Sequence, residues 1–382
     1  MTSKALLGVG ALMRKFLQRL LSKPVSRWAD KYTSRPDKIR IHEALTELNS
    51  KIVATNYKKG PLLNFNTATD RFIIFSDMHK GAKDGSDDFA FCENNYLQAL
   101  EYYDQNKFTF ISLGDAEELW ENTLAAVKKF NTPSFEKEKL FLARNAFIKI
   151  FGNHDLDWDN SPFAGLELEN IYGQKVPVYE GAVLRTSIAG TPIDIFLTHG
   201  HQGDELSDGN WFSKWFVAKI WAPFQAYLSI NPNTPAYYDH LKTDHNRFMY
   251  EWVAQQKNRL LITGHTHQPV FQSVTHIESL YKKLAQAKAA GDTKVIAALE
   301  AEIQLKKLAG HVQPDFTGYQ PTYFNSGCCC FNDGDITGIE IADEKIRLIK
   351  WEYGNDKTGN PERVILDEVS FIDLVTSMTL TS

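Results

Sequence analysis

Five short apolar runs along the chain each end abruptly in Asp, Asn or His. Because buried strands are typically short runs of β-branched and aromatic residues bounded by polar positions, these runs predict five strands. Side chains at the carboxyl ends of such strands gather at one edge of an α/β sheet, where ligands bind. The runs read RFIIFSDMH (71–79), KFTFISLGD (107–115), AFIKIFGNHD (146–155), IDIFLTHGH (193–201) and RLLITGHTH (259–267).

The spacing of the first three runs predicts parallel strands. Asp77, Asp115 and Asn153 follow one another at intervals of 38 residues (115 − 77 and 153 − 115). This length leaves room for a helical crossover between neighbouring parallel strands. Near the end of the chain, ITGIEIADEKIRLIKWE (336–352) alternates apolar and polar positions, which predicts an antiparallel hairpin that closes the sheet.

Helical patterns occupy the start of the chain and a stretch after the fifth run. Residues 1–65 are predicted to form a helical extension that packs either on the domain or on a membrane surface. Residues 276–310 are rich in Ala and Lys on either side of Gly291, which predicts a helical hairpin at the surface or in an oligomer contact. The amphipathic pattern of the extension rests on Leu17, Leu20 and Leu21 beside Arg14, Arg19 and Lys23.

A second helical insertion, residues 205–258, is predicted between the fourth and fifth runs. Aromatic side chains interleaved with lysines favour a lid over a binding site or a contact with a membrane surface. The tryptophans and lysines of this pattern are Trp211, Trp215 and Trp221 with Lys214 and Lys219. The alternative is a helix that docks on the domain through Phe212, Phe216 and Ile220, which share a helical spacing.

Composition narrows the class of protein. The formal charge of −5 and the pI of about 6.1 argue against a nucleic-acid binder, because neutralising phosphates needs an excess of Lys and Arg. Three of the four cysteines are the consecutive Cys328–Cys330, which we interpret as reduced, buried strand residues that cannot close a four-thiolate site. No apolar run is long enough to span a bilayer, and basic residues follow the apolar patch 5–13 without a cleavage signal. We therefore expect a cytoplasmic protein, with peripheral membrane contact through the tryptophans as an alternative.

The polar residues at the strand ends are of the types that bind divalent transition metals. Imidazole and carboxylate groups are suitable ligands, and one carboxylate can serve two ions. The candidates are Asp77, His79, Asp115, Asn153, His199, His265 and His267, which fill two sites if Asp115 is shared. In THGHQGD, His199 directly follows the strand and is preferred as the ligand, so His201 is expected to face the substrate. We interpret His240, His245, His276 and His311 as structural, since a histidine in a core is usually only hydrogen-bonded.

The five strand-end blocks, in their order along the chain, carry a resemblance to a known family. SDMH, LGDAEELWE, FGNHD, THGH and GHTH resemble the signature blocks of the calcineurin-like metallophosphoesterase superfamily. The resemblance covers roughly residues 71–270 and implies an α/β fold, a four-layer αββα sandwich of two mixed sheets, here with helical insertions. We therefore expect a catalytic domain over 66–352, which contains the two insertions, followed by a C-terminal tail over 353–382.

The resemblance also implies a role for each site residue. Asp77, His79, Asp115 and His267 would hold one metal ion, and Asp115, Asn153, His199 and His265 the other. His154 matches the histidine that contacts the substrate phosphate or protonates the leaving oxygen. Asp155 is expected to orient the His154 imidazole. The cofactors would be two ions of Mn, Fe or Zn, with a metal-bridging hydroxide as the nucleophile.

The second block bears on the substrate. GDAEELWE lacks the Arg of the GDxxDRG pattern in phosphoprotein phosphatases, and it resembles the UDP-2,3-diacylglucosamine hydrolase branch, whose members have an apolar lid. GNHD, in contrast, departs from the GNRD of that branch. The expected function is hydrolysis of a phosphoester, with a lipid-linked or nucleotide-sugar pyrophosphate as the substrate. The alternatives are a nucleotide or cyclic-nucleotide phosphodiesterase and a non-catalytic metal-binding scaffold.

Overall fold

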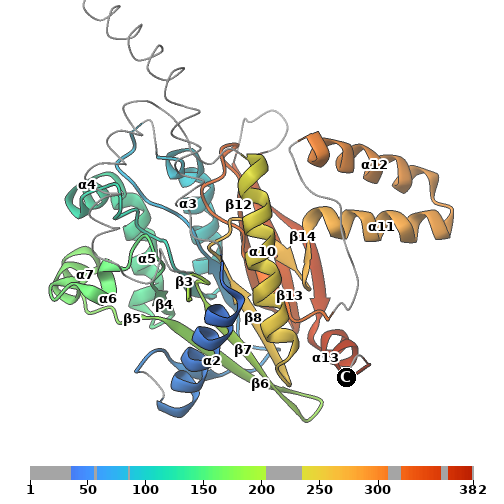
Figure 1. Cartoon of the computed structure of the whole chain (residues 1–382). Helices are drawn as coiled ribbons and strands as arrows, with labels where there is room; N and C mark the ends of the chain where they lie inside the picture. Colours follow the sequence, from blue (N-terminus) through green and yellow to red (C-terminus); the bar gives the residue numbers. More distant parts are fainter. Residues whose placement is uncertain are drawn as a thin grey trace, which may run out of the picture.

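The computed structural model describes residues 36–55, 58–84, 87–203, 235–308, 320–353 and 360–380. In these residues the chain forms two seven-stranded mixed sheets with helices on their outer faces (Figure 1). The predicted α/β fold with two mixed sheets is therefore confirmed. The tryptophans of the predicted lid, Trp211, Trp215 and Trp221, lie outside the described residues, as do the amphipathic stretch near Leu17 and His311.

One sheet contains the first three predicted strands. They are β2, β3 and β4, which run parallel to one another, and the short β5 extends the sheet beyond β4. On the other side of β2 lies the predicted hairpin, β12 and β13, which is antiparallel and leads to β14 at the edge. The bounds are β2 (Phe72–Phe75), β3 (Thr109–Leu113), β4 (Phe147–Ile150), β5 (Val178–Tyr179), β12 (Ile336–Ala342), β13 (Lys345–Glu352) and β14 (Glu362–Ser370).

The other sheet contains the fourth and fifth predicted strands, β7 and β8, as parallel neighbours. β6 forms an antiparallel hairpin with β7, and β11 lies parallel to β8 on its other side. The order of the strands in this sheet is β1-β6-β7-β8-β11-β9-β10. The bounds are β1 (Leu62–Asn64), β6 (Gly181–Ile188), β7 (Thr191–Thr198), β8 (Arg259–Thr263), β9 (Val270–Phe271), β10 (Val274–Thr275) and β11 (Tyr323–Asn325).

Helices cover the outer face of each sheet. α3 and α5 pack on the sheet of β2, whereas α2 and α10 cross the outer face of the sheet of β8 (Figure 1). The bounds are α2 (Lys38–Thr55), α3 (Phe89–Gln105), α4 (Leu124–Phe130), α5 (Thr132–Ala143), α6 (Asp157–Asn160), α7 (Ala164–Tyr172), α10 (Pro235–Ala254), α11 (His276–Ala290), α12 (Thr293–Leu308) and α13 (Phe371–Leu380). No helix among the described residues has both the length and the apolar character needed to cross a membrane.

The buried strands are continuously apolar because each contributes to two cores. Ile74 of β2 packs between the sheets, whereas its neighbour Phe75 packs against α3. In the same way, Ile262 of β8 faces the inter-sheet core and Leu261 faces α2 and α10. Since successive side chains of a strand point to opposite faces, a strand covered on both sides has no polar face.

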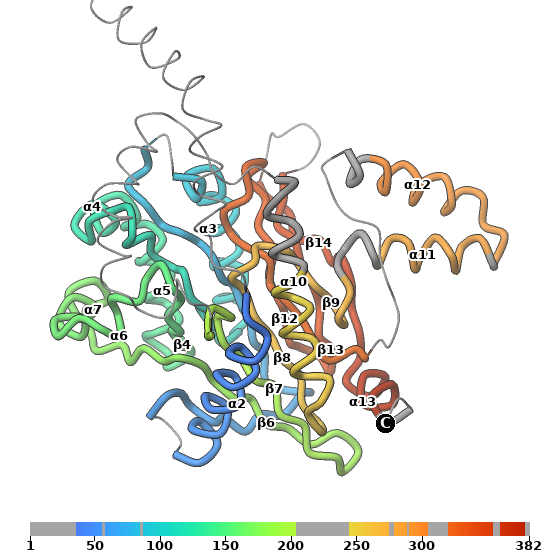
Figure 2. The backbone as a smooth tube through the Cα atoms, viewed as in Figure 1, coloured from blue at the N-terminus to red at the C-terminus, as the bar shows by residue number. Residues whose placement is uncertain are grey.

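The last part of the chain and the helical hairpin are attached at the edge of the first sheet. Residues 362–380, which the sequence analysis assigns to a tail, form β14 and α13, and Phe371 is buried in the inter-sheet core. α11 and α12 project from the body of the protein in Figures 1 and 2. Their own apolar contacts, including Leu284 and Ile303, hold them together, and Lys283 on α11 forms an ion pair with Asp367 of β14 at 2.6 Å.

Candidate metal centre

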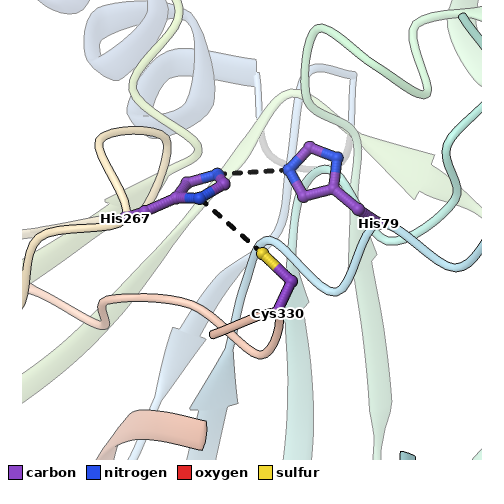
Figure 3. A group of neighbouring side chains, drawn as sticks. All are labelled: His79, His267 and Cys330. Atoms are coloured by element: carbon purple, nitrogen blue, oxygen red, sulfur yellow. Dashed lines mark hydrogen bonds between the residues drawn. The ribbon is translucent and has the colours of Figure 1, made fainter. Parts of the chain in front are cut away.

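The polar residues that follow the five predicted strands meet between the carboxyl ends of the two sheets. On one side, the Nε2 atom of His267 lies 3.1 Å from Asp77 Oδ1 and 3.2 Å from His79 Nε2. His79 Nε2 is also 3.8 Å from Asp77 Oδ1. Figure 3 shows the imidazoles of His79 and His267 facing each other across this space. A carboxylate and two imidazoles thus point at one place.

Asp115 joins this group to a second one. Its Oδ2 atom lies 3.7 Å from His79 Nε2 and 3.1 Å from His199 Nε2. Ligand atoms of Asp115, His199 and His265 all lie within 4.8 Å of one another. Asn153 is buried nearby, and its Oδ1 atom has no hydrogen-bond partner among the described residues. The structure therefore brings together the seven residues that the sequence analysis selected as ligands.

The orientation of the imidazoles fits metal binding. His79 Nδ1 is 2.8 Å from Glu118 Oε2, and His199 Nδ1 is 2.9 Å from the carbonyl oxygen of Leu113. A histidine that binds a metal commonly donates its other ring N–H to such an acceptor. The Nε2 atoms, which face the carboxylates, are then the nitrogens available to a metal ion. The donor set, together with the unpaired amide oxygen of Asn153, fits two divalent ions that share Asp115.

Charge compensation at the site depends on protons in the absence of cations. Burial lowers the pKa of His199, but Asp115 and Asp77 outweigh it and raise this pKa to about 9. Burial raises the pKa of Asp115, but His199 and His154 outweigh it and hold the pKa well below its usual range. In contrast, burial and the neighbouring His245 hold the pKa of His265 well below its usual range, so its imidazole is neutral. The carboxylates are thus ionised and surrounded by groups able to exchange a proton for a metal ion.

His154 lies at the more exposed rim of the site. Its ring stacks on Trp120 with centroids 4.2 Å apart, and its backbone N–H donates to Asp115 Oδ1 at 2.8 Å. Asp155 is the residue predicted to orient this imidazole, but it is Glu118 whose Oε2 atom lies against His154 Nδ1, at 2.7 Å. Asp155 is engaged elsewhere, because its carboxylate accepts from the backbone N–H groups of Gly152 and Ala116. It therefore ties the turn after β4 to the turn after β3.

Glu118 is a residue of the site that the sequence analysis missed. One oxygen of its carboxylate contacts the Nδ1 atoms of both His79 and His154. Burial raises the pKa of Glu118, but His154 and His79 outweigh it and lower the pKa to about 2. The available signal was its place three residues after Asp115 in GDAEELWE, within the turn that follows β3.

The backbone at the strand ends is sharply bent. Five ligand candidates have positive φ angles, which for residues other than glycine cost about 1–3 kcal/mol each and are concentrated at functional sites. They are Asp77 (54°), His79 (50°), Asp115 (50°), His265 (68°) and His267 (56°). Glycines allow the close approach of these turns. A Cβ atom at Gly114 would lie 2.5 Å from the His199 ring, and one at Gly152 would lie 2.2 Å from Asp115 Oδ1.

Two further predictions concern side chains beside the ligands. His201 is buried, and the centroid of its ring lies 5.5 Å from that of the His199 ring. Its contact with the substrate stays a prediction. Cys328–Cys330 are free and buried, as expected, but they lie in a loop after β11 and not in a strand. The loop brings Cys330 Sγ to 3.7 Å from His267 Nδ1, a contact that the sequence analysis did not anticipate.

The chain is similar to known proteins in two comparisons. A family model described as calcineurin-like phosphoesterase matches residues 70–269, more than half of the 382 residues. A search of the curated proteins gives no match. Among solved structures, vacuolar protein sorting 29 from Cryptosporidium parvum matches 79% of this chain and 98% of its own, at 11% identity and a TM-score of 0.32. At that score the assignment to a family depends on the family model.

Proposed function

Because the chain belongs to the calcineurin-like phosphoesterase family, we propose that it hydrolyses phosphoester bonds at a centre of two divalent metal ions. The observation that carries the proposal is the shared position of Asp115, whose Oδ2 atom lies 3.1 Å from His199 and 3.7 Å from His79. One ion would be held by Asp77, His79, Asp115 and His267, and the other by Asp115, Asn153, His199 and His265. When bound, two such ions supply an activated water and positive charge for the phosphoryl oxygens.

The chain's own residues supply the rest of the chemistry. Nδ1 of His154 lies against Glu118 Oε2 at 2.7 Å, which leaves Nε2 as the nitrogen that a substrate can reach. The stack on Trp120 restricts rotation of the ring, and the His154 side chain is 26% exposed, so a substrate can reach it. We assign His154 to protonation of the leaving oxygen, since phosphoryl transfer needs positioning and a proton for the departing group.

The test is hydrolysis of p-nitrophenyl phosphate and of its diester with Mn²⁺, with metal content measured on the same samples. On a phosphoester with an alkyl leaving group, which needs a proton to depart, His154→Ala is expected to keep its metals and to lower kcat by about 10²- to 10⁴-fold; on the nitrophenyl esters the loss is expected to be smaller. His42→Ala serves as the matched control, since His42 lies on α2 and contacts the carbonyl oxygen of Phe248. Full activity of His154→Ala on the alkyl ester would refute the assigned mechanism. A wild-type protein with neither activity nor bound metal would instead support the non-catalytic scaffold.

For the substrate, we propose a phosphoester or pyrophosphate with an apolar tail. The proposal is supported by the GDAEELWE block and by Trp211, Trp215 and Trp221 in the sequence, which favour an apolar cover. Initial rates on a lipid-linked pyrophosphate and on a bare nucleotide or cyclic nucleotide would compare the two classes. Faster turnover of the nucleotide would favour the phosphodiesterase alternative.

A further inference from the structure

Each of three imidazoles that face the candidate metal centre has a different acceptor behind it. His79 Nδ1 contacts the carboxylate of Glu118 at 2.8 Å, and His199 Nδ1 contacts the carbonyl oxygen of Leu113 at 2.9 Å. Behind His267 the corresponding atom is the sulfur of Cys330, 3.7 Å from Nδ1 (Figure 3). A thiol is a weaker acceptor than a carboxylate or a carbonyl oxygen, so His267 is held differently from the other two.

The backbone directly before Cys330 is hydrogen-bonded at two points. The N–H of Cys329 donates to the carbonyl oxygen of Asp77 at 3.2 Å, which ties the cysteine loop to the turn after β2. The N–H of Thr337 donates to the carbonyl oxygen of Cys328 at 3.0 Å, which ties the loop to β12. Cys330 is buried, with 9% of its surface exposed. These contacts hold the loop beside Asp77 and β12, and in this arrangement the Cys330 sulfur lies next to His267.

A metal ion in the candidate centre would decide which ring nitrogen of His267 carries the proton. Nε2 lies 3.1 Å from Asp77 Oδ1 and 3.2 Å from His79 Nε2, so Nε2 faces the space shared by the ligands. A metal ion at that place needs the Nε2 lone pair, which requires the proton to be on Nδ1. The N–H at Nδ1 then has the Cys330 sulfur as its acceptor.

We propose that Cys330 is a positioning residue, which accepts a hydrogen bond from His267 Nδ1 and thereby sets how tightly this half of the centre holds its metal ion. The inference rests on the proposed function only in that it assumes a divalent ion between Asp77, His79 and His267. Cys330 acts through His267 and does not itself bind the ion. Removing the acceptor frees the ring to rotate and favours the tautomer with the proton on Nε2, where it competes with the metal.

Metal affinity provides the first test, with Zn²⁺ as the probe in competition with a chelator at fixed pH. Cys330→Ala is expected to weaken Zn²⁺ binding by about 10- to 100-fold, the usual effect of removing a partner of a ligand histidine. Cys330→Ser keeps an acceptor and is expected to retain affinity within a few-fold. Cys92→Ala is the matched control for disturbing the loop without removing the acceptor, because the buried thiol of Cys92 on α3 donates to the carbonyl oxygen of Phe331. It is expected to keep wild-type affinity. Unchanged affinity in Cys330→Ala, or equal loss in the Ala and Ser variants, overturns the proposal.

Spectroscopy separates a hydrogen bond from direct ligation. In the Zn²⁺-loaded protein, ¹⁵N spectra of His267 are expected to show the proton on Nδ1, and finding it on Nε2 overturns the proposal. Co²⁺ substitution is expected to give no sulfur-to-metal charge-transfer band, since such a band would make Cys330 a ligand. A loss of affinity in Cys328→Ala but not in Cys330→Ala would transfer the acceptor role to Cys328, which also lies against His267.

Activity measured on the same samples distinguishes this inference from the proposed function. If wild type binds Zn²⁺ and Cys330→Ala binds it more weakly, but no phosphoester is hydrolysed with Mn²⁺, the proposed function fails and the inference stands. If wild type hydrolyses the ester and Cys330→Ala keeps wild-type affinity, the inference alone fails. A wild type that binds no metal overturns both.

Discussion

Two clusters of buried ionisable side chains lie side by side around the turns after β2 and β3. Their charges are compensated in different ways. The converging cluster comprises Asp77, His79, Asp115, His199 and His267. The paired cluster comprises Lys80, Glu117, Glu138 and Lys149, all of them buried. The two alternate along the chain, because Lys80 directly follows His79 and Glu117 is two residues from Asp115.

In the paired cluster the lysines and glutamates compensate one another's charge. Lys80 Nζ lies 2.6 Å from Glu138 and 3.1 Å from Glu117, and Lys149 Nζ lies 2.8 Å from Glu117. Burial raises the pKa of Glu117, but Lys149 and Lys80 outweigh it and lower the pKa to about 2. Trp158 Nε1 donates to Glu117, and the hydroxyls of Tyr96 and Tyr172 donate to Glu138. Two cations meet two anions, and no further ion is required.

The converging cluster contains no lysine or arginine, so its carboxylates are balanced either by protonated imidazoles or by bound cations. Its carboxylates face imidazoles, and its metal-facing nitrogens and oxygens point at one another without the fixed positive charges that lysines provide. Buried charges are costly unless they are paired. The comparison teaches that burial and residue type do not identify a site. A site is identified by donor atoms that point at a common space, which the metal ions would fill.

Asp115→Asn, in the converging cluster, is expected to have the largest effect of the proposed variants on metal content and hydrolysis rate. An amide cannot compensate two cations, so bound metal should be lost along with several kcal/mol of transition-state stabilisation, or roughly 10³-fold in rate. Elemental analysis and Mn²⁺-dependent hydrolysis measure both losses, and Asp343→Asn on the exposed turn between β12 and β13 is the control. Retention of two metal ions by folded Asp115→Asn would show that this carboxylate is not shared.

Glu117→Gln is expected to break the paired cluster and to act on stability. Removing one partner leaves Lys149 with its buried charge uncompensated, which costs about 3–5 kcal/mol. Urea unfolding measures this loss, and the exposed Glu136→Gln is expected to change stability by less than about 0.5 kcal/mol. The double variant Glu117→Gln/Lys149→Met should recover part of the stability, since the stranded lysine is removed. A double variant less stable than the single one would contradict this account.

Lowering the pH is expected to affect the converging cluster before the paired cluster, without any substitution. Metal binding needs deprotonated imidazoles, and the metal-free pKa of His199 is about 9, so protons compete increasingly as the pH falls below that value. The contribution of Glu117 is present above its unfolded value of 4.5 and is lost only as the pH falls through about 2. Metal content after dialysis should therefore decline at higher pH than the near-ultraviolet circular dichroism. Coincident transitions would show that the metal and the fold are lost together.

Much of the fold could be predicted from local pattern. The five apolar runs are strands β2, β3, β4, β7 and β8, the 38-residue intervals do correspond to parallel neighbours, and ITGIEIADEKIRLIKWE is a hairpin. In contrast, β14 and α13 lie in a region that the sequence analysis assigns to a tail. Ile365 of β14 is exposed at the sheet edge. An edge strand therefore lacks the continuous apolar run that identifies a buried one.

The sequence by itself determined which residue types stand at the strand ends, because a buried strand and its polar end are adjacent in the chain. Tertiary structure alone decided how those residues are used. Glu118 pairs with His154, 36 residues away, in place of Asp155, and Cys330 reaches His267 across 63 residues. Such contacts depend on how two sheets pack and how their turns bend, which no local periodicity encodes. For the same reason, Lys80 and His79 are neighbours in sequence but belong to different clusters.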